Sequence, residues 1–254
     1  MATRLDGTVA LVTGASSGIG EATALALAAE GAAVALAARR RDRLDALARK
    51  IEGDGGRVLV TETDVTDEAQ AAAAVEATVE QLGRLDVVIN NAGLMLLGPI
   101  VGADTSEWRR MVELNVLGLM YVTAAALPHL LRAAEEGPRR VSDLVNVSSV
   151  AGRVARLNSG AYNATKWAVN AFSEALRQEV TERHVRVALV EPGAVSTELA
   201  GHNRPEVLQG LRSSLGAIER MEAGDIADAI TYAVTRPRHV AMNELLIRPT
   251  QQVR

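Results

Sequence analysis

The chain contains no cysteine, and this absence excludes disulfides, thiolate nucleophiles and cysteine-ligated metals. The four histidines are scattered without ligand spacing, so we expect no metal site. Aromatic residues make up only 2% of the chain, and a core must therefore be packed from Ala, Val and Leu. The hydrophobic fraction of 48% over 254 residues suffices for one large domain.

Basic blocks and long apolar runs are also missing. The formal net charge is −4, and no basic stretch offers the electrostatic footprint of a nucleic-acid-binding protein. The N-terminal sequence MATRLDGTVALVTG has no long apolar signal-peptide core, and we expect no run of the roughly 20 apolar residues that a membrane span needs. These features predict a cytoplasmic protein that contacts neither nucleic acid nor membrane.

Short apolar runs alternate with helical patterns along the whole chain, without repeats or a linker. Strands are expected at 9–12, 33–38, 58–61, 85–89, 144–147, 185–190 and 243–247. Helices are expected after the first strand and at 42–51, 67–82, 105–131, 162–182 and 225–234, with a charged loop at 133–143. This alternation predicts a single α/β domain, residues 1–254, built on one doubly wound parallel sheet.

A glycine-rich turn, TGASSGIG at 13–20, lies between the first strand and a helical run. Glycines in that context permit a tight turn and the close approach of a pyrophosphate, which the N-terminus of the helix then binds. The spacing is GxxxGxG, with Gly14, Gly18 and Gly20, rather than GxGxxG. The string alone is also typical of an ordinary linker.

The second strand ends at Ala38 and is followed by Arg39, Arg40 and Arg41. An acidic residue at this point normally binds the ribose 2′-hydroxyl of NAD, and none is present here. Arginines suit a 2′-phosphate instead, so the sequence favours NADP(H) over NAD(H). The alternative is that Arg40 and Arg41 are the solvated start of the next helix.

Tyr162 and Lys166 are four residues apart in a helical run, which places both side chains on one face. An ammonium near a phenol favours the phenolate, so we expect the pKa of Tyr162 to fall below its usual value of about 10. Ser149 follows a strand-like run, and its hydroxyl could point at the same place. Such a trio suits proton transfer to a carbonyl oxygen. A Tyr and a Lys on a wet surface would give the same spacing.

The motifs occur in the order TGASSGIG, NNAG, Asn115, VSS, YNATK and PGAVST, and as a set they closely resemble the short-chain dehydrogenase/reductase family over essentially the whole chain. The resemblance implies a Rossmann-type sheet of about seven strands that binds a nicotinamide dinucleotide. It also implies that Tyr162 is the general acid/base, that Lys166 tunes it, that Ser149 orients the substrate oxygen and that Asn115 anchors a water. From the residues alone, Asn115 could equally lie on a wet helix face.

The same resemblance implies the residues that bind the cofactor. They are Gly14, Ser16, Ser17, Gly18, Ile19, Gly20, Arg39, Arg40, Asp64, Val65, Asn90, Ala92, Gly93, Tyr162, Lys166, Pro192, Gly193, Val195 and Thr197. Two departures matter: the loop before the Ser149 strand looks a few residues long, and the C-terminus lacks a VDGG-like ending. The ending resembles an NADP-linked subset that includes 3-hydroxy acid (serine-type) dehydrogenases and the clavulanate-pathway reductase.

The expected activity is therefore that of an NADPH-dependent carbonyl reductase, reversible as an alcohol dehydrogenase. Two alternatives remain: a silent cofactor-binding regulatory protein, and an epimerase or dehydratase on the same fold. A polar stretch at 199–214 is expected to cover a partly apolar substrate, and Arg153 or Arg156 could meet a substrate carboxylate. By resemblance, the long helices at 105–131 and 162–182 are expected to pair across a two-fold axis in a dimer or tetramer.

Overall fold

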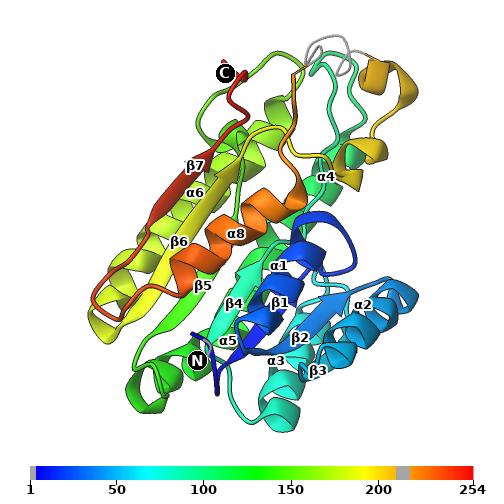
Figure 1. Ribbon diagram of the computed structural model, residues 1–254. Coiled ribbons are helices and arrows are strands. Elements are labelled where there is room, and N and C mark those ends of the chain that lie inside the picture. Colours follow the sequence, from blue (N-terminus) through cyan, green and yellow to red (C-terminus); the bar gives the residue numbers. More distant parts are fainter. Residues whose placement is uncertain (1–3, 210–217, 254) are drawn as a thin grey trace.

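A seven-stranded parallel sheet forms the centre of the molecule (Figure 1). The computed structural model describes residues 4–209 and 218–253. The strands are β1 (Val9–Thr13), β2 (Ala33–Ala38), β3 (Val58–Glu62), β4 (Val87–Asn90), β5 (Ser142–Val147), β6 (Val185–Pro192) and β7 (Glu244–Ile247). Their order is β3-β2-β1-β4-β5-β6-β7, and every pairing is parallel. The predicted doubly wound, Rossmann-type sheet is confirmed.

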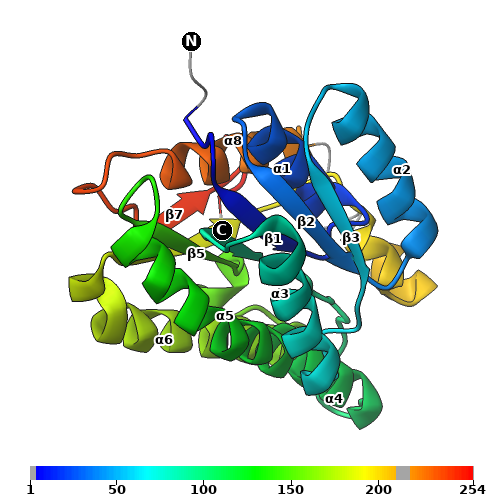
Figure 2. The same cartoon turned by 90° about the horizontal axis from the view of Figure 1, so that it is seen from below.

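Helices cover both faces of this sheet (Figure 2). One layer contains α1 (Gly18–Ala29), α2 (Arg41–Gly53) and α8 (Ala223–Val234), and the other contains α3 (Glu68–Leu82), α5 (Leu119–Glu136) and α6 (Gly160–Val180). The chain winds outward from β1 to β3 and then returns to β4 on the other side of β1. The crevice between the carboxyl ends of β1 and β4 is thus the switch point at which open α/β sheets bind ligands.

Aliphatic side chains fill both interfaces between sheet and helices. Along β1, Ala10 and Val12 pack with α1, α2 and α8, whereas Val9 and Leu11 pack with α3, α5 and α6. This division follows from the period-2 alternation of side chains in a strand. The buried members of both clusters are Ala, Val and Leu, joined by Ile in the first cluster, so the expectation of an aliphatic core is confirmed.

The long helical region at 105–136 differs from the prediction in two ways. It consists of α4 (Thr105–Val112), a π-helical stretch (Glu113–Gly118) and α5, and it continues five residues beyond the expected end. Buried Ala133 and Ala134 extend the apolar face of α5, so the predicted loop at 133–143 shrinks to the residues between Glu136 and Ser142. Gly137 ends the helix in an extended conformation.

Contrary to the sequence expectation, this same region contains an 18-residue window with a mean hydropathy of 1.5, which is long and apolar enough by composition to cross a membrane. Within the fold it packs against α3, α6 and the sheet. A π-helical turn interrupts it, and Asn115 lies buried in that turn. Of that window, 39% is buried inside the fold, and a single helix of this kind is weak evidence for a membrane span.

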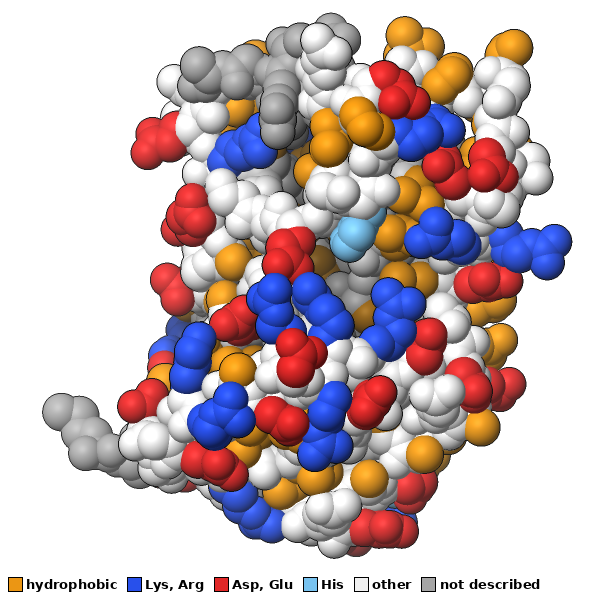
Figure 3. Space-filling view, turned by 90° about the vertical axis from the view of Figure 1, so that its right-hand side faces the viewer, with side chains coloured by type: hydrophobic (Ala, Val, Ile, Leu, Met, Phe, Trp, Pro, Cys, Tyr) orange, Lys and Arg blue, Asp and Glu red, His pale blue; other side chains and the backbone are white. Residues whose placement is uncertain are grey.

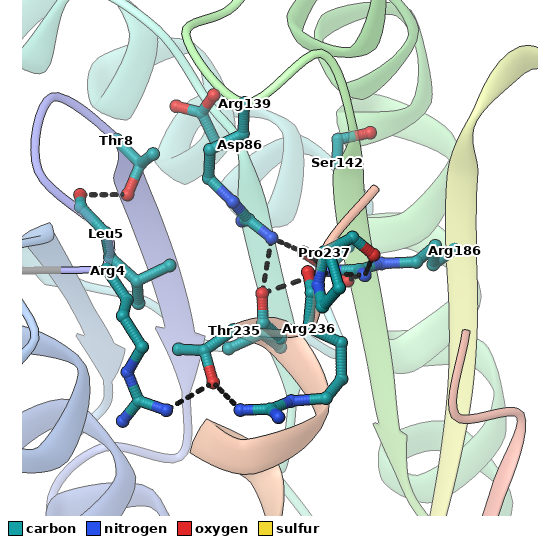
Figure 4. Close-up of polar contacts among 12 residues, drawn as sticks. Arg4, Leu5, Thr8, Asp86, Arg139, Ser142, Arg186, Thr235, Arg236 and Pro237 are labelled. Carbon is teal, nitrogen blue, oxygen red and sulfur yellow. Dashed lines mark hydrogen bonds and ion pairs between the residues drawn. The ribbon is translucent and has the colours of Figure 1, made fainter. Parts of the chain in front are cut away.

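A polar network closes the amino-terminal end of the sheet, opposite the crevice (Figure 4). Arg186 of β6 forms a two-pronged ion pair with buried Asp143 of β5 at 2.7 and 3.0 Å. The same guanidinium donates to the carbonyl oxygens of Val234, the last residue of α8, and of Arg236 and Val240 in the segment that follows. Carbonyl groups at the end of a helix lack intrahelical partners, so Arg186 satisfies them and ties α8 to the sheet.

Candidate active site

A cleft of about 1110 Å³ opens at the carboxyl ends of the strands. It is larger than the usual ligand pocket of about 300–1000 Å³, so it has room for a dinucleotide and a substrate together. Of the residues predicted to bind or react, those that line it are Gly14, Ser16, Ser17, Gly18, Ile19, Arg39, Arg40, Asp64, Val65, Ala92, Gly93, Ser149, Tyr162, Lys166, Pro192, Gly193, Val195 and Thr197. Gly20, Asn90 and Asn115 lie behind its wall.

The glycine-rich turn has the shape that a pyrophosphate requires. Gly14 and Gly18 adopt φ values of +65° and +56°, which side-chain-bearing residues rarely adopt. A Cβ at Gly14 would lie 2.8 Å from the Cα of Ala92, and one at Gly20 would overlap the Gly14 carbonyl oxygen. The chain then enters α1 at Gly18, where the first amide groups have no helical partner. These residues fit the phosphates of a dinucleotide.

Asn91, which the sequence analysis passed over, ties this turn to the next loop. Its amide donates to the carbonyl oxygens of Thr13 and Gly14 at 3.1 and 3.2 Å. Asn90, which the resemblance assigns to support of the central strand and the cofactor, is absent from the cleft lining, and its side-chain amide donates to Thr123 and Asn146, both at 2.9 Å. Adjacent side chains of an extended segment point to opposite sides, so only one of the two can face the ligand.

The end of the cleft near β2 is rich in arginine. Arg39 and Arg40 line it together with Asp64, and the three residues directly after Ala38 are all arginine. Arg39 is exposed and lies 3.8 Å from the Asp64 carboxylate. Figure 3, which faces the α2 side of the molecule, shows basic side chains gathered there among acidic ones.

Ser149, Tyr162 and Lys166 meet in the wall of the cleft. Tyr162 and Lys166 are both buried, on the same face of α6. The Ser149 hydroxyl lies close enough to the Tyr162 phenol to lower its pKa. The Lys166 Nζ donates to the Val147 carbonyl oxygen at 3.0 Å and lies 5.9 Å from the centre of the Tyr162 ring. The predicted juxtaposition of the three side chains is confirmed.

The prediction that the pKa of Tyr162 falls is wrong for the protein without bound cofactor. Burial raises the pKa of Tyr162 to about 12, and the Ser149 hydroxyl offsets only part of that rise. Burial also lowers the pKa of Lys166 to about 8. Both shifts have one cause: the site removes water from the charged form of each group. The sequence shows the spacing of the pair but not its depth, so only the attraction between the two groups was foreseen.

Asn115 lies in the π-helical stretch behind the trio. Its Oδ1 accepts from the Leu94 amide at 2.7 Å, and its Nδ2 donates to the Leu94 carbonyl oxygen at 2.8 Å and to Thr165 at 3.1 Å. The residue is buried, which decides against the wet-face alternative. It fixes the segment after β4 against the helix that carries Tyr162.

The two arginines considered for a substrate carboxylate have different positions. Arg153 donates to Glu191 at 2.7 and 2.8 Å, pairs with Glu244 and is absent from the cleft lining, so its predicted role is wrong. These two carboxylates raise the pKa of Arg153 still further. Arg156 does line the cleft, next to Leu157 and Asn158.

The predicted substrate cover, residues 199–214, is described as far as residue 209. It begins as a short 3-10 helix (Glu198–His202), and residues 205–209 are helical. Leu199, His202 and Leu208 line the cleft. Buried Asn203, which sequence reasoning missed, accepts from the Leu97 amide at 2.7 Å and donates to the Met95 carbonyl oxygen at 2.9 Å. Residues 210–214 lie outside the described part of the chain.

Comparison with known proteins places this site in a family. A family model described as short chain dehydrogenase matches residues 8–207. An uncharacterized oxidoreductase, SSP1627, of Staphylococcus saprophyticus is 38% identical over 96% of both chains. Glycine betaine reductase ATRR of Emericella nidulans is 40% identical over 98% of this chain, which spans only 19% of that protein.

Solved structures agree. An alcohol dehydrogenase from Thermococcus sibiricus with 5-hydroxy-NADP has a TM-score of 0.85 and 30% identity, covering 97% of this chain and 98% of that one. A 3-ketoacyl-(acyl-carrier-protein) reductase from Brucella melitensis with NADH has a TM-score of 0.85 and 30% identity, and the match covers 98% of this chain and 100% of that one. The closed form of serine dehydrogenase with NADP⁺ has a TM-score of 0.87 and 28% identity, and the match covers 97% of each chain.

The chain belongs to the short-chain dehydrogenase/reductase family. It is an oxidoreductase that acts between an alcohol carbon and a carbonyl carbon, and its cofactor is a nicotinamide dinucleotide. Its similar structures include complexes with NADP and with NADH, so the choice between the two cofactors depends on the residues of this chain.

Proposed function

We propose that this protein is an NADPH-dependent carbonyl reductase, reversible as an alcohol dehydrogenase, with Tyr162 as its general acid/base. The observation that supports this most strongly is a buried phenol that lines the cleft beside the Ser149 hydroxyl and the Lys166 ammonium. With a pKa of about 12, the phenol is protonated at neutral pH and therefore starts reduction as a proton donor.

The other residues of the cleft bind the cofactor or assist the proton transfer. The bound cofactor supplies or accepts the hydride, which is chemistry that no side chain can perform. The glycine-rich turn and the N-terminus of α1 hold its phosphates, and Arg39 and Arg40 hold the 2′-phosphate. Ser149 donates a hydrogen bond to the substrate oxygen while Tyr162 protonates it. Lys166 is the nearby cation that stabilises the phenolate left behind.

The substrate side of the cleft favours a small to medium, partly apolar ketone or aldehyde. Leu94, Leu97, Leu199 and Leu208 supply apolar walls, and Arg156 is the basic group suited to a substrate carboxylate. An Arg156→Ala variant should raise KM for acidic substrates and leave KM for matched neutral ones unchanged. Equal effects on both would remove the carboxylate from the proposal.

The test of the proposal is Tyr162→Phe, which removes one oxygen from a well-packed site. The turnover of NADPH with a carbonyl panel should fall about 10²- to 10⁴-fold, whereas NADPH should still bind. Tyr232→Phe is the matched control, because Tyr232 is half exposed on α8, far from the cleft lining. Near-normal rates in Tyr162→Phe would refute the assignment. Product formed without NADPH oxidation would indicate an epimerase or dehydratase instead.

We also propose that the enzyme works in the cytoplasm as a homodimer or homotetramer. Members of this family are typically oligomeric, and Val112, Leu117 and Trp167 leave an apolar strip exposed on the α4 and α6 side of the molecule. A strip of this kind suits a two-fold contact in which the same surface is used twice. A monomer in multi-angle light scattering would contradict the proposal.

A further inference from the structure

Arg40 does not reach freely into the cleft but is folded back over the glycine-rich turn. Its Nε and Nη2 donate to the Ser16 hydroxyl at 3.1 and 3.0 Å, and its Nη2 donates to the Ser17 hydroxyl at 2.7 Å. Its remaining nitrogen, Nη1, donates to the Glu198 carboxylate at 2.8 Å. Each of its three nitrogens therefore already has an acceptor.

Glu198 comes from a distant part of the chain, the first residue of the 3-10 helix that follows β6. Its other carboxylate oxygen lies 3.8 Å from the Nη2 of Arg43. Two guanidinium groups thus face one carboxylate, and the bond from Arg40 lowers the pKa of Glu198, so Glu198 is ionised at neutral pH. All three side chains are about half exposed, so ligand can reach the place that the carboxylate occupies.

We infer that Glu198 is a cofactor-selecting residue: its carboxylate occupies the arginine site that a cofactor 2′-phosphate needs, and NADP(H) must displace it. The inference rests on the proposed use of NADP(H). A phosphate and a carboxylate are both oxygen anions that bind guanidinium groups through charge-assisted hydrogen bonds. NAD(H) carries a hydroxyl at that position and does not compete for Arg40. Glu198 therefore weakens the binding of NADPH but not of NADH, and so reduces the preference of the enzyme for NADPH over NADH.

The size of the effect follows from the exposure of the pair. Exposed ion pairs are typically worth about 0.2–1 kcal/mol, which corresponds to a factor of up to about five in a binding constant. Glu198→Gln keeps the shape and removes the charge. We expect it to lower the Kd for NADPH about two- to fivefold and to leave the Kd for NADH nearly unchanged. Because the pair is exposed to salt, the gain should shrink as ionic strength rises.

The experiment is a double-mutant cycle with Glu198→Gln, Arg40→Ala and the double variant, each titrated with NADPH and with NADH. In the Arg40→Ala background, Glu198→Gln should no longer change the ratio of the two dissociation constants, because the two act on each other. Glu62→Gln is the matched control: Glu62 is an exposed carboxylate at the end of β3, outside the cleft lining.

Two results would overturn the inference. If Glu198→Gln leaves the NADPH/NADH ratio at the wild-type value, Glu198 does not compete with the phosphate. If it weakens NADPH binding, Glu198 instead holds Arg40 in a useful position. Either result leaves the proposed NADPH preference intact as long as the wild-type protein prefers NADPH. A wild-type protein that binds NADH more tightly would refute the proposed cofactor itself, whatever the variant does.

Discussion

Replacing Lys166 with methionine should make the protein more stable and at the same time inactive. The chain has two lysines. Lys50 lies on the surface, whereas Lys166 is buried in the wall of the cleft. Burial lowers the pKa of Lys166 from 10.5 to about 8, and the folded state must pay for holding the proton at neutral pH. Methionine has a similar shape and no charge.

The magnitude follows from the shift. At about 1.4 kcal/mol per pKa unit, the charged Lys166 costs the fold about 3 kcal/mol at pH 7. Losing its 3.0 Å bond to the Val147 carbonyl oxygen offsets about 1 kcal/mol of the gain. Lys166→Met should therefore raise the free energy of unfolding at pH 7 by about 2 kcal/mol.

The stabilising effect of Lys166→Met should also depend on pH. Between pH 8 and 10.5 the unfolded chain binds more protons than the folded one at this residue, so wild-type stability rises with pH through that window. The advantage of the variant should accordingly shrink to near zero by about pH 9.5. Urea unfolding at fixed protomer concentration, with Lys50→Met as control, measures both values. Nitrogen-labelled lysine would give two NMR signals and the Lys166 pKa directly.

A Lys166→Met variant that is less stable than wild type at pH 7, or whose added stability does not depend on pH, would contradict the cost assigned to burying the Lys166 charge. So would a Lys166 signal that titrates at or above 10.5. Loss of turnover alone would test only the proposed catalytic role of Lys166 and not the cost of its burial.

Three further predictions concern other parts of the molecule. Arg186→Met should lower the free energy of unfolding by about 3 kcal/mol in urea titrations, because it removes one of two partners from a buried carboxylate and uncaps α8. The kcat of the folded variant should stay near wild type, since the network is at the far end of the sheet. Asn203→Ala should raise substrate KM severalfold with little change in the Kd for NADPH, because it frees the cover from the Leu97 and Met95 backbone. Asn115→Leu should lower the melting temperature and kcat together, because it leaves the amide and carbonyl groups of Leu94 buried without their partner.

Each of these has an outcome that would contradict it. A stable Arg186 variant would mean that Arg139, which also pairs with Asp143, satisfies the carboxylate without help. An Asn203 variant that loses cofactor and substrate affinity equally would point to a general loosening of the cleft. An Asn115 variant with normal activity would show that the backbone of Leu94 can hold its place unaided.

The fold and the position of the site follow from local patterns. Alternating apolar runs and helical periods predict a doubly wound sheet because a parallel strand is buried on both faces and each helix must cover one of them. The four-residue step between Tyr162 and Lys166 fixes a shared helix face, and the two side chains do lie together. The helix boundaries depend on more than the local pattern: α5 continues beyond its predicted end because Ala133 and Ala134 are buried, which periodicity alone does not show.

Other features depend on which distant segments meet. Arg153 and Arg156 look alike in the sequence. In the fold, Arg153 forms ion pairs with Glu191 and Glu244, whereas Arg156 lines the cleft. Glu198 meets Arg40 across 158 residues of chain, and no spacing rule connects them.

The sequence by itself determined the fold class, the family and the shared helix face of Tyr162 and Lys166, because these depend on periods and spacings of a few residues. The tertiary structure decided the electrostatics. Whether the Tyr162 phenol gains or loses acidity depends on how much water the whole fold removes from it, and burial is a sum over every segment packed around the site.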